Sequence, residues 1–216
     1  CIRDRSHVRQ LVRHTVDELE NQGFDWSKFD NDGDGYVDAL NIIHQGAGAE
    51  QGDHSNIWSH KSSLGELSVL YDGVIINSYT MNPEIQSGNI AAIGVLSHEF
   101  GHALGLPDLY DTDYSSSGAG TYSLMASGAW GTTGNSPWHP STMIGWCKNQ
   151  LGWVEIVNIS ESQNGIQLEQ TYSNDQIIRI NHPTVPEEYW LIENRQQVGS
   201  DTLMPDGGLA IWHVND

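Results

Sequence analysis

The sequence predicts an α+β fold, because two kinds of apolar pattern occupy different parts of the chain. Residues 1–152 combine helical spacing with short runs of strand length, whereas residues 153–216 carry only short alternating runs that are typical of strands. A chain of 216 residues is long enough for one large domain, or for one domain and the start of another. We therefore expect a first domain over residues 1–152 and an incomplete β-rich segment over residues 153–216.

Three helices are expected. Apolar residues at helical spacing predict the first over residues 6–21, with an inner face made by Val8, Leu11, Val12, Val16 and Leu19. The second is expected over residues 90–104, because Asn89 can cap its start and Gly105 lies where a left-handed residue ends a helix. Its apolar side would be formed by Ile90, Ile93, Leu96 and Phe100 or Ala103. A shorter helix is expected over residues 142–150.

The expected strands are short. In the first domain, apolar runs predict strands over residues 39–44 and 73–79. In the β-rich segment, the strand-like runs are residues 155–159, 176–180, 189–193 and 209–214. Between these elements the chain is rich in Gly and polar residues, most of all between the second helix and about residue 136, which predicts long loops there.

The charge balance is strongly acidic, with 28 acidic and 9 basic residues and a formal net charge of −19. This composition argues against nucleic acid and against an anionic membrane surface, both of which attract clustered Lys and Arg. It is compatible with bound divalent cations and also with a well-solvated surface of a secreted protein. No apolar run approaches the ~20 residues of a membrane span.

The two cysteines and the two chain ends bear on the compartment. Cys1 and Cys147 form no disulfide framework, and their pairing stays open. The chain begins without a signal peptide and ends within the apolar run of residues 209–214. We therefore interpret it as a piece of a longer precursor.

The pattern His98-Glu99-Phe100-Gly101-His102 places two imidazoles one turn apart on one face of the second helix. Neutral imidazoles at this spacing can hold one Zn²⁺ ion. Glu99 projects beside that metal, where a carboxylate can act as a general base. The alternative is a surface helix with two solvated histidines, and the residues after the helix argue against it.

A catalytic zinc site needs a third protein ligand and an open position for water. No Glu occurs between Gly101 and Val154, so the design that takes a glutamate from a later helix has no candidate. In the other design, a Gly soon after the second His ends the helix and the third ligand follows at the same short spacing. Gly105 and Asp108 stand at these positions, so we expect Asp108 to be the third ligand. Weaker candidates are Asp111, Asp113 and His139.

Met125 lies in a run of small residues, Ser123 to Gly128, that follows the helix motif. In zinc enzymes with this extended motif, a tight turn carries a Met beneath the metal. A lone Met is more often a filler of the core. Because the helix motif precedes it, we interpret Met125 as the residue of such a turn.

The acidic segment Asp30–Asp38 has the ligand spacing of the first part of an EF-hand calcium loop. The first ligand positions would be filled by Asp30, Asp32, Asp34, the backbone carbonyl of Tyr36, and Asp38. Asn41 stands where the closing Glu belongs and a strand follows, which excludes a regulatory EF-hand. A structural Ca²⁺ site and a metal-free turn both remain open, and calcium is favoured because clustered carboxylates repel one another without a cation.

The segment from His98 to Asp111 resembles the immune inhibitor A family of secreted bacterial metallopeptidases, a metzincin-like group. Three further stretches are similar to that family, namely residues 32–38, 189–196 and 208–214. The resemblance implies a metzincin-like zinc metalloprotease domain with a mixed sheet and an active-site helix. It also implies a secreted, extracellular bacterial protein.

The resemblance carries roles onto individual residues. It implies that His98, His102 and Asp108 bind zinc and that Glu99 is catalytic. Many metzincins have an assisting Tyr shortly after the Met, but Ser127 stands at that position, so no Tyr role is implied.

These motifs predict hydrolysis of peptide bonds in protein or peptide substrates by a metal-activated water, with Glu99 as the general base. One alternative is a non-enzymatic, calcium-stabilised binding or adhesion module that keeps a degenerate zinc site. The intact His98, Glu99 and His102 argue against it. A second alternative is a zinc hydrolase that acts on a non-peptide amide.

Overall fold

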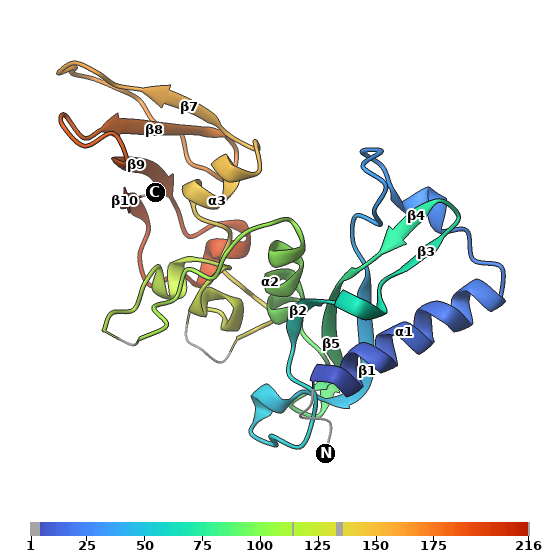
Figure 1. The fold of residues 1–216 in the computed structure, drawn as a ribbon. Helices are drawn as coiled ribbons and strands as arrows, with labels where there is room; N and C mark the ends of the chain where they lie inside the picture. Colours follow the sequence, from blue (N-terminus) through green and yellow to red (C-terminus); the bar gives the residue numbers. More distant parts are fainter. Residues whose placement is uncertain (1–4, 114, 133–135, 216) are drawn as a thin grey trace. The chain divides into compact units, whose positions relative to one another are not determined.

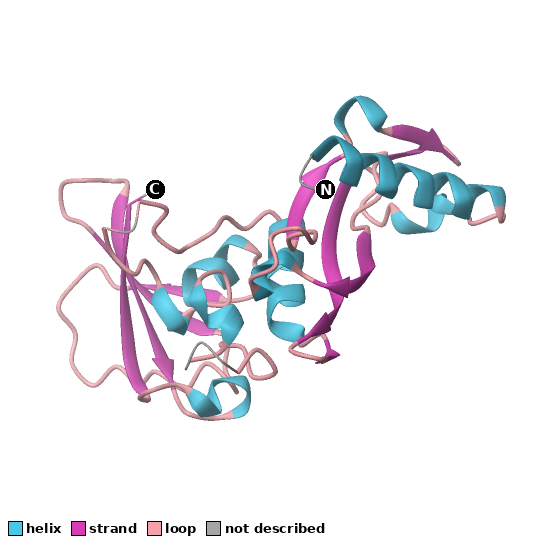
Figure 2. Ribbon diagram, turned by 90° about the horizontal axis from the view of Figure 1, so that it is seen from below, coloured by secondary structure: helices cyan, strands magenta, loops and turns pink. Residues whose placement is uncertain are grey.

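The computed structural model describes residues 5–113, 115–132 and 136–215 (Figure 1), so Cys1 lies outside the described residues. The chain divides between Gly105 and Leu106 into two compact units. Each unit mixes helices with strands, as Figure 2 shows, which agrees with the predicted α+β class. None of the described helices has the length and apolar character that crossing a membrane requires.

The first unit is built on a mixed sheet. Its central strand β5 (Ser78–Gln86) pairs in parallel with β1 (Asn41–Ala47) and antiparallel with β2 (His60–Ser63) and β6 (Asn89–Ile90). A separate hairpin joins β3 (Val69–Tyr71) to β4 (Val74–Ile76) through Asp72 and Gly73, both at positive φ. That turn chemistry is the preferred one for two-residue hairpin loops.

Helix α1 (Arg5–Asn21) agrees with the helix predicted over residues 6–21. Its apolar face is buried in the core of the first unit through Val8, Val12 and Val16. The same core takes in Trp26, Ile76, Tyr79 and Met81. Short 3-10 helices in this unit span Trp26–Phe29, Ala49–Gln51 and Gly65–Leu67.

Strand β5 is covered on both faces, because five consecutive residues from Tyr79 to Pro83 are buried. Tyr79 and Met81 belong to the core that α1 covers. Helix α2 (Ile93–Ala103) also packs against β5 and β2. The sheet therefore positions the helix that carries both histidines of the motif.

The start of α2 differs from the prediction. Ser87 and Gly88, both at positive φ, reverse the chain after β5, so that Asn89 and Ile90 pair back as β6. The helix then starts at Ile93, after a bond from the Ala92 amide to Gln86. The expected apolar side is also wrong at its start, since Ile90 is 86% and Ile93 is 58% exposed. Hairpin pairing here overrides a helix-like pattern in the sequence.

The run predicted as one strand over residues 73–79 is two strands, β4 and β5, separated at Asn77. The backbone carbonyl of Asn77 accepts a hydrogen bond from the Leu64 amide (2.8 Å), and its side chain accepts one from the Gly65 amide (3.1 Å). These bonds to another segment interrupt the ladder. β5 then continues to Gln86, beyond the predicted end.

The second unit contains a four-stranded sheet in the order β10-β9-β8-β7. The strands are β7 (Glu155–Asn158), β8 (Gln176–Asn181), β9 (Glu188–Arg195) and β10 (Gly208–Asn215), and only β7 and β8 pair in parallel. All four predicted strand runs of the β-rich segment are thereby confirmed. Three 3-10 helices precede or join them, at Gly120–Tyr122, Ser127–Trp130 and Gly199–Leu203.

Helix α3 (Gly145–Gln150) starts later than the predicted residue 142. The Thr142 amide donates to the Asp201 carboxylate and the Thr142 carbonyl accepts from the Leu124 amide, so Thr142 is engaged outside the helix. Cys147 of α3 is fully buried with Met125, and burial raises the pKa of its thiol to about 12. The thiol therefore stays protonated and acts as an apolar core residue.

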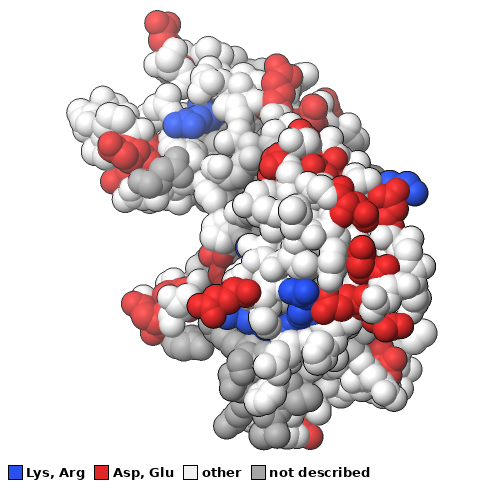
Figure 3. Space-filling model, turned by 45° about the vertical axis from the view of Figure 1, so that its right-hand side comes forward, with Lys and Arg blue, Asp and Glu red and all other residues white. Residues whose placement is uncertain are grey.

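At the surface, Figure 3 shows acidic side chains spread over the face in view, with few basic ones between them.

Candidate metal centre

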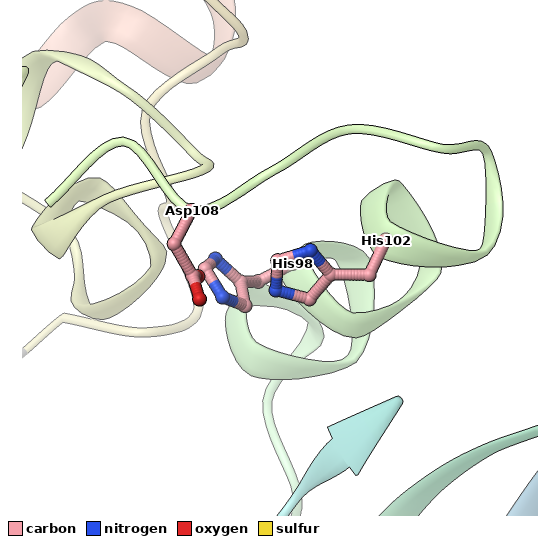
Figure 4. A group of neighbouring side chains, drawn as sticks. All are labelled: His98, His102 and Asp108. Atoms are coloured by element: carbon pink, nitrogen blue, oxygen red, sulfur yellow. The ribbon is translucent and has the colours of Figure 1, made fainter. Parts of the chain in front are cut away.

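Helix α2 presents His98 and His102 on successive turns of one face. The centroids of their rings lie 4.7 Å apart, and the ring planes are at 84° to each other. Figure 4 shows both rings on the side of the helix that faces Asp108. This is the arrangement that the sequence spacing predicts.

The helix ends at the predicted glycine. The Leu104 amide still bonds to the Phe100 carbonyl (3.0 Å), whereas the Gly105 amide bonds to the His102 carbonyl (3.0 Å) in a tighter turn. Gly105 has a φ of +94°, a region that side-chain-bearing residues rarely adopt. The chain can therefore leave the helix immediately after the second histidine.

Asp108 comes from the loop after this turn, and its carboxylate lies beside the histidines (Figure 4). One ligand atom from each of His98, His102 and Asp108 lies within 4.8 Å of the others. Ligands of a tetrahedral zinc ion stand roughly 3.3 Å apart, since each lies about 2.0–2.1 Å from the metal. Two imidazoles and one carboxylate that lie within 4.8 Å of one another are close enough to close around a zinc ion that keeps one position open for water.

Glu99 is the buried acidic residue of α2, with 7% of its surface exposed. It directly follows His98, so any metal held by the histidines is close to it along the helix. Its predicted role as a general base stays a prediction.

The peptide that follows Asp108 is held on both sides. The Leu109 amide donates to the Met125 carbonyl (2.7 Å), and the Leu109 carbonyl accepts from the Ala119 amide (2.8 Å). These two bonds use main-chain groups only. Two neighbouring loops therefore fix the segment that presents Asp108.

Met125 is fully buried in a turn that is closed by bonds from the Ala126 and Gly128 amides to the Ser123 carbonyl, each 3.0 Å. It packs in one core with Leu106, Ile144 and Cys147. Its carbonyl accepts the hydrogen bond from the Leu109 amide, so this turn supports the segment next to Asp108 through the backbone. Its interpretation as the Met-bearing turn of a zinc enzyme remains a prediction.

Tyr110 contacts the candidate ligand Asp108, although the sequence pattern did not predict a role for it. Its hydroxyl donates a hydrogen bond to Oδ2 of Asp108 (2.8 Å). A hydrogen bond to a carboxylate that binds a metal fixes its orientation. The only signal in the sequence is the position of Tyr110 two residues after Asp108.

Tyr110→Phe should weaken zinc binding by about tenfold, because outer partners of zinc ligands typically contribute 10–100-fold in affinity or activity. The dissociation constant can be measured by competition with a chromophoric chelator. Tyr172→Phe is the matched control, since Tyr172 is 67% exposed and lies in the β-rich segment. Equal affinities of Tyr110→Phe and the parent would rule out this role.

Gly118 lies against the segment that follows Asp108. A Cβ atom on Gly118 would come within 2.3 Å of the Leu109 carbonyl oxygen and 2.9 Å of Cα of Tyr110. Gly120 has almost the same φ, +56° against +54°, but its Cβ would have only Ser117 Cβ nearby, at 3.9 Å. Alanine substitutions at Gly118 and Gly120 therefore distinguish the effect of steric contact from the effect of backbone strain.

Gly120→Ala should lower the free energy of unfolding by about 1–2 kcal/mol through the left-handed backbone alone. Gly118→Ala should lose about 1–3 kcal/mol more, because the ligand-bearing segment has to move. Urea denaturation with equal m-values provides both numbers. If the two variants were equally stable, the contact with Leu109 would be unimportant.

The weaker ligand candidates lie outside the group formed by His98, His102 and Asp108. Asp111 is used by its own loop, where hydrogen bonds from the Ser115 hydroxyl and from the Asp113 amide hold the pKa of its carboxyl well below the usual range. Asp113 accepts a bond from the Ser115 amide (2.9 Å). Neither these two residues nor His139 joins the ligand cluster among the described residues.

The acidic loop of the first unit brings together three of its predicted ligands. One oxygen from each of Asp30, Asp32 and Asp38 lies within 4.8 Å of the others, whereas Asp34 is not part of this group. The loop is also organised by its own hydrogen bonds, such as those from the Gly33 and Gly35 amides to Asp30. Oxygens of the Asp30 carboxylate are thus partly occupied by backbone donors.

The comparison with protein families decides between the possible descriptions of the chain. The model of the family described as "Immune inhibitor A peptidase M6, catalytic domain" matches residues 5–154. The chain belongs to this family. The resemblance found from the motifs is thereby confirmed, and the match covers α1, the mixed sheet, α2 and the loop with Asp108 and Met125.

Curated relatives support the same assignment. This chain is 32% identical to "Immune inhibitor A" of Bacillus thuringiensis subsp. alesti over an alignment of 213 residues. The alignment covers 81% of this chain and 30% of that protein. The chain is 33% identical over 193 residues to "Pre-pro-metalloprotease PrtV" of Vibrio cholerae serotype O1, which covers 71% of this chain and 20% of that protein. The chain thus spans less than a third of the length of these relatives.

Proposed function

We propose that this chain is a zinc-dependent endopeptidase, and that it hydrolyses peptide bonds within protein or peptide substrates. The observation that carries the proposal is the convergence of ligand atoms from His98, His102 and Asp108 within 4.8 Å. Membership of a peptidase family and relatives named as a metalloprotease support it. When bound, zinc would polarise the scissile carbonyl and lower the pKa of a water to about 7.

The residues of the chain divide the remaining work. His98 and His102 bind as neutral imidazoles, and Asp108 adds one negative charge that makes the site less positive than three imidazoles would. Glu99 accepts the proton of the attacking water and delivers it to the nitrogen of the leaving amine. The burial of Glu99 supports this role, since excluding bulk water strengthens electrostatic interactions and prevents the loss of the proton to solvent.

In this proposal, residues 1–152 form a metzincin-like catalytic domain and residues 153–216 form the β-rich segment that follows it. The protein would be secreted by a bacterium, as "Pre-pro-metalloprotease" in the name of the Vibrio cholerae relative suggests for that protein.

Cleavage of denatured casein tests the proposal. The chain should release peptides, a zinc chelator should abolish the release, and added zinc should restore it. Endopeptidase action should produce internal cuts, which mass spectrometry of the products identifies. A chain that binds zinc but releases no peptide would favour the alternative of a non-enzymatic binding module.

We also propose that the acidic loop binds a structural Ca²⁺ ion through Asp30, Asp32, Asp34, the carbonyl of Tyr36 and Asp38. The support is the approach of three of these carboxylates to one another. Calcium at 100 times its dissociation constant should raise the free energy of unfolding by about 2.7 kcal/mol. Asp32→Asn should remove this gain and Asp53→Asn, a change in an exposed loop, should retain it. The loop would be a metal-free turn if calcium left the parent's unfolding curve unchanged.

A further inference from the structure

Three charged side chains are buried together in the second unit. Glu193 and Arg195 of β9 are 0% and 2% exposed, and Asp201 of the following 3-10 helix is 5% exposed. All three lie beyond residue 154, where the match to the family's catalytic domain ends. A buried charge is costly unless it is paired and hydrogen-bonded, and apolar residues of similar volume are often at least as stable. Because burying these three charges is costly, their hydrogen bonds indicate a role beyond packing.

Arg195 and Asp201 form a close ion pair that also reaches the loop before Met125. Nε of Arg195 donates to Oδ2 of Asp201 (2.7 Å), and Nη1 of Arg195 donates to the backbone carbonyl of Tyr122 (3.1 Å). Oδ1 of Asp201 accepts from the Thr142 amide (2.9 Å), and the Thr142 hydroxyl donates to the same carboxylate. The pair thus holds two chain segments at once.

Thr142 connects the ion pair to the loop of residues 122–125. Its carbonyl accepts a hydrogen bond from the Leu124 amide (3.2 Å), so the segment from Tyr122 to Leu124 is held at both ends. The next residue, Met125, accepts the bond from the Leu109 amide, and Leu109 directly follows Asp108. An unbroken path of hydrogen bonds and peptide bonds therefore runs from the buried ion pair to the third ligand.

Glu193 ties the same cluster to α3 and β10. Its Oε1 accepts from the Gly145 amide (3.2 Å) and from Nε1 of Trp212 (2.8 Å), and Nη1 of Arg195 lies 3.4 Å from it. Glu193 thereby fixes the side of Arg195 that Asp201 does not contact. The guanidinium is held in one orientation, with Nη1 directed at the Tyr122 carbonyl.

We propose that Arg195 and Asp201 are positioning residues of the peptidase, which hold the 122–125 loop and, through it, the segment that presents Asp108. This positioning role rests on the proposed function, in which Asp108 is a zinc ligand. It makes part of the β-rich segment a component of the active centre, although that segment lies outside the matched catalytic domain. Neither residue touches the reacting atoms.

Two conservative variants test the proposal in the chain of residues 1–216. Arg195→Lys keeps the charge, but one ammonium group cannot replace the forked guanidinium that contacts Asp201 and Tyr122 together. Asp201→Asn keeps the shape and removes the charge. The matched control is Arg179→Lys, because Arg179 lies on the same sheet but its guanidinium covers the Tyr189 ring and bonds to Asn181.

For each variant that folds by circular dichroism, we expect a zinc dissociation constant raised about tenfold, as for outer-shell partners of metal ligands. The value of kcat should fall by about the same factor with KM within twofold, and the Leu109 amide should exchange hydrogen faster. Arg179→Lys should match the parent in all three measurements. A purely structural role would lower the unfolding midpoint without changing zinc affinity in the folded protein, and that result would overturn the proposal.

Should both variants fail to fold, Thr142→Val removes one hydroxyl from the cluster and keeps the backbone bonds. It should raise the zinc dissociation constant by about threefold, and an unchanged constant would overturn the proposal. Zinc affinity is measured without substrate, so failure of the positioning role can be told apart from failure of the proposed function. A parent that cleaves no casein contradicts the proposed function, whereas an active parent with variants of parental zinc affinity contradicts the positioning role.

Discussion

Glu99→Gln should lower kcat for peptide hydrolysis by roughly 100- to 10,000-fold, which is the range that a positioned general acid–base group contributes. The amide has almost the shape of the carboxylate, so the buried position in α2 remains filled. It cannot accept the proton of the attacking water. His98 and His102 are unchanged, and zinc content by elemental analysis should therefore stay at the parental value.

The control for this prediction is Glu66→Gln, which also removes one carboxylate but from an exposed position outside α2. It should leave kcat and zinc content unchanged. If Glu99→Gln kept activity within tenfold of the parent while binding zinc, a different group would have to be the base.

Asp108→Ala should weaken zinc binding at least 100-fold, because it removes the proposed third ligand, whereas outer partners of zinc ligands contribute 10–100-fold. Peptide hydrolysis should be lost at zinc concentrations that saturate the parent. Asp108→His should recover part of the affinity, since an imidazole is also a zinc ligand. Competition with a chelator provides the three dissociation constants.

Asp113→Ala is the appropriate comparison, since this acidic residue lies in the same loop but outside the ligand cluster. Its zinc affinity should equal that of the parent. Should Asp108→Ala retain the parental dissociation constant, the third ligand would have to be sought elsewhere, and the motif would be reduced to its two histidines.

The arrangement of the two histidines could be predicted because it depends on one helix. Residues four apart on a helix share a face whatever the rest of the fold does. The approach of Asp108 was predictable from Gly105, whose conformation ends the helix at a fixed place. The start of α2 was not, because the pairing of Asn89 with Gln86 depends on a hairpin that competes with the helix.

Contacts between distant residues were beyond what spacing can show. The bond from Arg195 to the Tyr122 carbonyl joins positions 73 residues apart, and no local pattern marks it. In the acidic loop, the spacing of the carboxylates predicted that Asp30, Asp32 and Asp38 would be neighbours, and these three do come together. It also included Asp34, whose carboxylate instead accepts a hydrogen bond from the Tyr36 amide. Regular spacing predicts which groups can meet, and the folded loop selects among them.

The two hydrogen bonds that hold Leu109 have an evolutionary consequence. They join amide and carbonyl groups that every residue except proline carries, so most side chains at positions 109, 119 and 125 are compatible with them. Gly118, in contrast, has no space for even one methyl group. Among homologous enzymes, we expect this loop to keep its backbone path while side chains outside the core vary, with Asp108, Gly118 and the buried Met125 as positions that tolerate little change.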